Sequence, residues 1–142
     1  MKFAGFVVLA LLVIAQFFQP ARTNPASQPD MSFKFVAKPS SEVAAVLESS
    51  CHDCHSNDTV WPWYSRVAPV SWLVASDVKD GRRHLNFSEW GNYGPEATKL
   101  KLKEMCNEIK AGEMPLWIYT LMHPDSKLSP EDVRTLCSAA GQ

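Results

Sequence analysis

Cys51-His52-Asp53-Cys54-His55 is a C-x-x-C-H motif, and this spacing is typical of covalent attachment of c-type haem. The two thiols lie along one helical turn and can reach both vinyl groups of one porphyrin. The next side chain, His55, can then place an imidazole nitrogen on the iron from the proximal side. The motif predicts one covalent haem c, with thioether bonds at Cys51 and Cys54 and with His55 as the proximal iron ligand.

Two other chemistries use a C-x-x-C pair. A thioredoxin-like redox pair needs a βαβ context, and the sequence shows no such pattern. A zinc site built on Cys51 and Cys54 needs a second clustered pair of ligands, whereas Cys106 and Cys137 stand far apart. Haem attachment is therefore favoured over both, and His52 inside the motif is interpreted as a spacer without a ligand role.

Helices are predicted on both sides of the motif from capping residues, prolines, glycines and apolar residues at helical spacing. They run from Ser41 and Glu42 into Cys51, from Pro69 to Gly81, from Gly94 and Pro95 to Gly112, and from Ser129 and Pro130 to Gly141. No segment alternates as a strand does, so the expected fold is all-α: a small class I cytochrome c-like helical domain wrapped around one covalent haem. The porphyrin is expected to complete a core that roughly 95 residues alone would make only marginal.

Aromatic residues are frequent between the motif and the third of these helices. Together they could wall the porphyrin, but for each one taken singly, ordinary packing in the protein core is favoured. They are Trp61, Trp63, Tyr64, Trp72, Phe87 and Trp90.

The N-terminus has the pattern of an export signal, because Lys2 precedes an apolar run over residues 3–15. This run is shorter than the roughly 20 apolar residues that span a bilayer comfortably. Residues 1–19 are expected to form a signal peptide or membrane anchor helix. Residues 20–40, which contain three prolines, are expected to form an extended tether, and residues 41–142 the haem-binding domain.

The leader has no good cleavage site. Signal peptidase prefers a small residue three positions before the cut, but Gln19 would stand there for a cut after Ala21, and Asn24 for a cut after Ala26. We therefore expect an uncleaved anchor in the inner membrane, with the domain on the periplasmic side of the cytoplasmic membrane. Cleavage would instead give a soluble periplasmic protein.

Several uncommon sequence segments, which follow one another in a set order along the chain, mark a resemblance to a known protein family. The chain resembles the bacterial haem-binding domain family with a single C-x-x-C-H motif, over about residues 48–137 and, less closely, over residues 16–25. The resemblance implies a small exported cytochrome c-like domain that is often membrane-anchored. Besides the motif, it is carried by Trp61-Pro62-Trp63-Tyr64-Ser65, Ala68-Pro69-Val70-Ser71-Trp72-Leu73, Gly81-Arg82-Arg83, Leu85-Asn86-Phe87-Ser88-Glu89-Trp90 and Gly112-Glu113-Met114-Pro115.

Two residues compete as the distal iron ligand. Met114, followed by a proline and preceded by a helix that ends in glycine, resembles the methionine that supplies this ligand in class I cytochromes c. His123, which precedes Pro124, is the alternative, and an open iron site is the third possibility. His84 is interpreted as a cation at a helix end.

Cys106 and Cys137 are expected to form a disulfide, because haem uses the other two thiols and each remaining cysteine lies on the inner face of a late helix. Two buried free cysteines are the alternative. The bond would close a loop of about thirty residues that contains both candidate distal ligands.

The expected function is electron transfer between redox partner proteins, without an enzymatic reaction, because a filled iron site favours an electron carrier. The alternative is a haem-based peroxidase or a gas or redox sensor, which needs an open distal iron position. The 14 basic and 15 acidic residues nearly balance, and no basic patch indicates binding to nucleic acid.

Overall fold

The computed structural model describes residues 2–141, and within that range it is helical with no β-strand. The all-α prediction is therefore confirmed. The α-helices are α1 (Lys2–Ala15), α2 (Phe33–Ala37), α3 (Ser41–Ser50), α4 (His52–His55), α5 (Val70–His84), α6 (Pro95–Ala111), α7 (Trp117–Met122) and α8 (Pro130–Ala139). Short 3-10 helices are η1 (Pro29–Met31), η2 (Trp63–Arg66), η3 (Phe87–Asn92) and η4 (Pro124–Ser126).

Local capping explains where several helices begin and end. The side chain of Ser129 accepts a hydrogen bond from the backbone N–H of Asp132, whose carboxylate accepts from the N–H of Ser129, so α8 starts with a capping box. Helix α6 ends at Gly112, which has φ 76° and suits the left-handed conformation that closes a helix. Helix α3 is capped by Ser40, one residue before the predicted Ser41.

The predicted end of α5 at Gly81 is wrong. The helix continues to His84, and Gly81 is buried in its interior. A glycine within a helix can serve close packing as well as termination, and Gly81 has that role here, against the haem motif.

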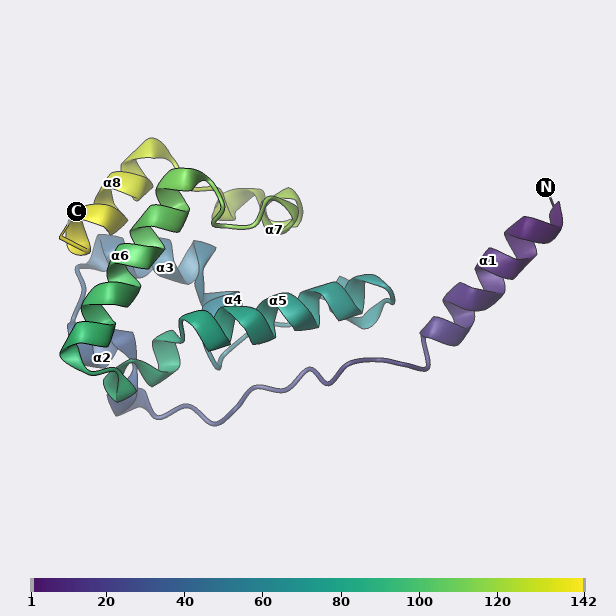
Figure 1. Cartoon of the computed structure of the whole chain (residues 1–142), viewed down its shortest axis with the longest axis horizontal. Helices are drawn as coiled ribbons and strands as arrows, with labels where there is room; N and C mark the ends of the chain where they lie inside the picture. Colours follow the sequence, from purple (N-terminus) through teal and green to yellow (C-terminus); the bar gives the residue numbers. More distant parts are fainter. Residues whose placement is uncertain (1, 142) are drawn as a thin grey trace.

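Helices α3, α6 and α8 pack together at the end of the molecule opposite α1 (Figure 1). They share a core with the turn that follows α5. Its buried members are Val43, Leu47, Leu85, Phe87, Trp90, Ile109 and Leu136.

A disulfide between Cys106 and Cys137 joins α6 to α8 and confirms the predicted pairing. Both residues are buried. Because the bond closes a loop across a sequence separation of 31 residues, the chain-entropy relation assigns it about 3 to 4 kcal/mol.

The Cys106→Ser, Cys137→Ser double variant should therefore unfold at lower denaturant concentration, with a free energy of unfolding reduced by about 3 kcal/mol. Chemical denaturation followed by circular dichroism measures this loss. An unchanged midpoint would show that the cross-link does not stabilise the domain.

The N-terminal segment is extended over a shorter stretch than the predicted tether of residues 20–40. Residues 29–37 contain η1 and α2, which pack on η3, and Phe33 makes edge-to-face contacts with Phe87 and Trp90. Figure 1 shows the extended part leading to α1, which stands apart from the other helices. Among the described residues, no helix is long and apolar enough to cross a membrane.

Candidate functional site

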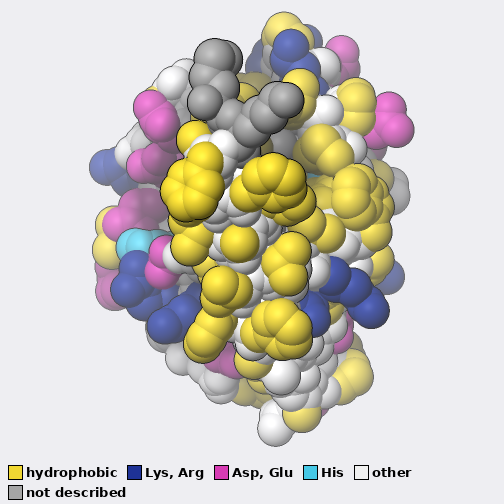
Figure 2. All heavy atoms as spheres, turned by 90° about the vertical axis from the view of Figure 1, so that its right-hand side faces the viewer, with side chains coloured by type: hydrophobic (Ala, Val, Ile, Leu, Met, Phe, Trp, Pro, Cys, Tyr) yellow, Lys and Arg dark blue, Asp and Glu magenta, His cyan; other side chains and the backbone are white. Residues whose placement is uncertain are grey.

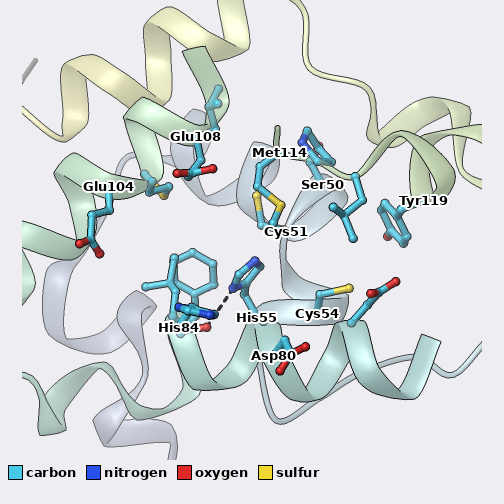
Figure 3. A pocket seen from close by; sticks show the side chains of 18 of the residues that line it. Ser50, Cys51, Cys54, His55, Asp80, His84, Glu104, Glu108, Met114 and Tyr119 are labelled. Atoms are coloured by element: carbon cyan, nitrogen blue, oxygen red, sulfur yellow. Dashed lines mark hydrogen bonds between the residues drawn. The ribbon is translucent and has the colours of Figure 1, made fainter. Parts of the chain in front are cut away.

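The C-x-x-C-H motif opens onto a cavity of about 600 Å³. Cys51, Cys54 and His55 contribute to its wall, and the opposite wall comes from α6, α7 and the loop between them (Figure 3). Much of the remaining wall is apolar. Its apolar members are Leu85, Phe87, Met105, Ile109, Met114, Pro115 and Leu116.

The imidazole of His55 is oriented by the backbone that follows α5. Its Nδ1 lies 3.0 Å from the carbonyl oxygen of Leu85. Because a carbonyl can only accept a hydrogen bond, Nδ1 carries the proton and Nε2 keeps its lone pair. Burial lowers the pKa of His55, which further favours the neutral ring. A neutral imidazole held through Nδ1 is the arrangement that metal-ligating histidines commonly adopt.

A buried polar network holds the Leu85 carbonyl in place. The side-chain amide of Asn86 donates to Oδ1 of Asn57 at 2.8 Å, and the backbone N–H of Asn57 donates to Oγ of Ser88 at 2.9 Å. These residues are almost completely buried, so each of these hydrogen bonds satisfies a group that would be costly to leave unpaired. The network fastens the loop after the motif to the turn after α5.

Gly81 allows α4 and α5 to approach each other closely. A Cβ atom at this position would lie 2.6 Å from the carbonyl oxygen of Cys54 and 3.1 Å from its carbonyl carbon. Both are backbone atoms, so they cannot move aside as a flexible side chain can. The absence of a side chain at Gly81 therefore sets the distance between α5 and the motif.

The Gly81→Ala variant should lose about 2 kcal/mol of stability, because the added methyl forces the two helices apart. It should also lower the yield of haem-loaded protein, since the motif would shift. Gly94→Ala is the control, because a Cβ there meets no atom within 4 Å. Thermal unfolding and the ratio of haem absorbance to protein measure both effects, and equal behaviour of the two variants would contradict this role for Gly81.

The two motif cysteines lack the properties of a catalytic thiol pair. Burial raises the pKa of Cys51 and of Cys54 to about 12, whereas a reactive C-x-x-C cysteine has a lowered pKa. A zinc site finds no support either, because Cys106 and Cys137 are bonded to each other. Within residues 2–141, moreover, no group of three or more His, Cys, Asp or Glu side chains is arranged to hold a metal ion.

Met114 reaches the cavity through the turn that ends α6. Gly112 reverses the chain, after which the backbone N–H groups of Glu113 and Met114 donate to the carbonyl of Glu108 at 3.0 and 3.3 Å. Met114 then lines the same cavity as Cys51 and His55 (Figure 3). The structure thus brings the methionine candidate to the motif.

His123, the alternative candidate, is not among the residues that line this cavity. Its Nε2 lies 2.7 Å from the hydroxyl of Tyr64, and its ring stacks on Tyr119 with centroids 4.5 Å apart. The contact with Tyr64 engages Nε2, one of the two ring nitrogens that could bind iron.

The six aromatic residues named from the sequence have different surroundings. Of the six, only Phe87 lines the cavity. Trp90 is a core residue, 2% exposed, whereas Trp63 and Trp72 are 73% and 43% exposed. The aromatic residue that the sequence analysis missed is Tyr119, which lines the cavity and donates through its hydroxyl to Oδ2 of Asp53 inside the motif.

The charged groups around the cavity include more acids than bases. Lys101 and His84 are the basic ones, and His84, interpreted from sequence as a helix-end cation, is both the last residue of α5 and part of the wall. The acidic residues are Asp77, Asp80, Glu104 and Glu108. Lys101 and His84 are therefore the wall side chains suited to an anionic group.

Comparison with known protein families matches residues 10–142 to the haem-binding domain family. The chain belongs to that family. Neither the comparison with curated proteins nor the comparison with solved structures finds a match.

The residues present fit a haem. The cavity is large enough for a cofactor of this size, two free cysteines and an oriented neutral imidazole share its wall, and seven of the other wall residues are apolar.

Proposed function

We propose that this haem-binding protein is a monohaem c-type cytochrome that carries electrons and remains attached to the periplasmic side of the cytoplasmic membrane. The observation that carries the proposal is the convergence of Cys51, Cys54, the Nδ1-bonded imidazole of His55 and Met114 on one cavity. Each of these groups has the chemistry that c-type haem requires of its protein.

In this proposal Cys51 and Cys54 would hold the porphyrin covalently, and His55 would bind its iron through Nε2. Met114 would supply a second iron ligand through its thioether sulfur. Haem bound in this way supplies a one-electron couple between ferrous and ferric iron. Two ligands that remain bound in both oxidation states would allow electron transfer with little rearrangement.

Met114 rather than His123 is proposed as the second ligand because of their surroundings. Met114 belongs to the cavity wall, whereas the ring of His123 is held by Tyr64 and Tyr119. A thioether stabilises ferrous iron and raises the reduction potential relative to a second histidine.

The ferrous protein should therefore bind carbon monoxide slowly or not at all, because both axial positions are filled. Rapid mixing followed by absorbance spectroscopy measures this directly. Fast and complete binding would show an open distal position, and the peroxidase or sensor function should then replace electron transfer.

A further inference from the structure

Helix α1 leaves its apolar side chains exposed in the part of the chain that the structure describes. All its described side chains are apolar or glycine, and nearly all of them are exposed. A helix that is hydrophobic on every side is stable in an apolar medium rather than in water. Lipid is therefore the medium that suits α1.

The end of α1 is fixed to the haem-binding domain. The side-chain amide of Gln16 donates to the carbonyl of Ala68 at 3.1 Å, and its Oε1 accepts from the N–H of Ala68 at 3.0 Å. Two residues further on, the carbonyl of Phe18 accepts from Nε1 of Trp72 at 2.7 Å. The family match, which begins at residue 10, also includes this junction in the domain.

Arg82 fastens the next part of the chain. Its guanidinium donates to the carbonyl of Thr23 and to Oδ1 of Asn24, both at 2.9 Å. It also donates to the carbonyl of Ser56 at 2.7 Å, directly after the haem motif. The segment after α1 is thus bonded along its length to the domain and cannot act as a free linker.

The surface around the junction is apolar. Residues 59–76 contain a single charged residue, Arg66. Figure 2 views the molecule from the side of α1, so that the hydrophobic side chains of α1 stand in the foreground, and most charged side chains lie toward the margins of this face. We define the apolar collar as Phe17, Phe18, Trp63, Val67, Val70 and Trp72, all of which are more than 40% exposed.

We propose that the apolar collar lies against the lipid bilayer that α1 enters. Aromatic side chains favour the membrane–water interface, and the contacts of Gln16 and Trp72 hold the collar at the base of α1. The cavity would then be presented to redox partners at a fixed orientation relative to the membrane. This inference rests on the membrane attachment in the proposed function.

The test uses the full, haem-loaded chain with vesicles of phosphatidylcholine and phosphatidylglycerol. A photoreactive benzoylphenylalanine is placed at Trp63, which is 73% exposed, or at the control position Leu100, which is 54% exposed on α6. After sedimentation and illumination, mass spectrometry counts lipid adducts. Position 63 should give about tenfold more lipid adduct than position 100, because only the former would lie at the interface.

The possible results distinguish a failure of the membrane attachment from a failure of the collar proposal. Protein that remains in the supernatant would overturn the membrane attachment itself. Protein that sediments but gives equal adducts at the two positions would overturn the collar while leaving the attachment intact. Adducts at position 63 with a second copy of the chain in place of lipid would also overturn the collar proposal.

Discussion

Replacing Met114 with alanine is expected to open the haem iron to carbon monoxide and to lower the reduction potential. Met105 and His84 also line the cavity, and Met114 is chosen over them because it lies in the loop after α6 and precedes Pro115, as a class I distal methionine does. His123 is held by Tyr64 and is not among the wall residues. The lost thioether is also expected to remove the weak sulfur-to-iron absorption band near the red end of the oxidised spectrum. Carbon monoxide binding should accelerate by at least about a hundredfold, as expected when a filled axial position becomes vacant.

His123→Ala is the matched control for Met114→Ala. This variant loses the hydrogen bond to Tyr64 and the stacking on Tyr119, so it should lose some stability. It should keep the sulfur-to-iron absorption band and the slow binding of carbon monoxide. If His123→Ala alone opened the iron, the axial assignment would be wrong. A bis-histidine carrier of lower potential would then be the better account.

The Cys51→Ser, Cys54→Ser double variant is expected to retain no covalent haem, because both thioether bonds are lost. It should also be much less stable, since the porphyrin that fills a largely apolar cavity of about 600 Å³ would be held by axial ligands alone. We expect the free energy of unfolding to fall by at least about 3 kcal/mol, the usual range for large losses in a core. Absorbance after acid–organic extraction and denaturant unfolding measure the two effects.

The Cys106→Ser, Cys137→Ser variant is the control for the motif cysteines. It has the same number of cysteine substitutions but removes only the disulfide, so it should keep covalent haem at full occupancy. Equal haem loss in both double variants would mean that the motif cysteines act only through folding.

Local signals in the sequence are sufficient to predict much of the helical framework. The ends of α6 are marked by Pro95 and Gly112, and the start of α8 by Ser129 and Asp132, because capping depends on residues a few positions apart. The disulfide could also be predicted, since two cysteines remain once the motif is assigned to haem.

Features that depend on contacts between residues far apart in the sequence could not be predicted. The bond from His55 to Leu85 joins positions thirty residues apart, and its acceptor is a backbone carbonyl, which residue type does not reveal. Gly81 was assigned to a helix end because nothing local shows that Cys54 packs against it. The helical turns at 29–37 form against Phe87 and Trp90, which propensity alone does not anticipate.

The hydrogen bond between His123 and Tyr64 could not be predicted for the same reason, since these positions are fifty-nine residues apart. In the sequence, both Met114 and His123 precede a proline. Only the tertiary arrangement distinguishes them, by placing one on the cavity wall and engaging the other with two tyrosines.

The most direct test of covalent haem binding is the intact mass of the full chain made with a cytochrome c maturation system and denatured in acidic organic solvent. The account predicts one haem added to the polypeptide mass, retained under conditions that strip non-covalent haem and mapped by peptide analysis to Cys51 and Cys54. A protein of unmodified mass would contradict it, even if haem absorbance were present before denaturation.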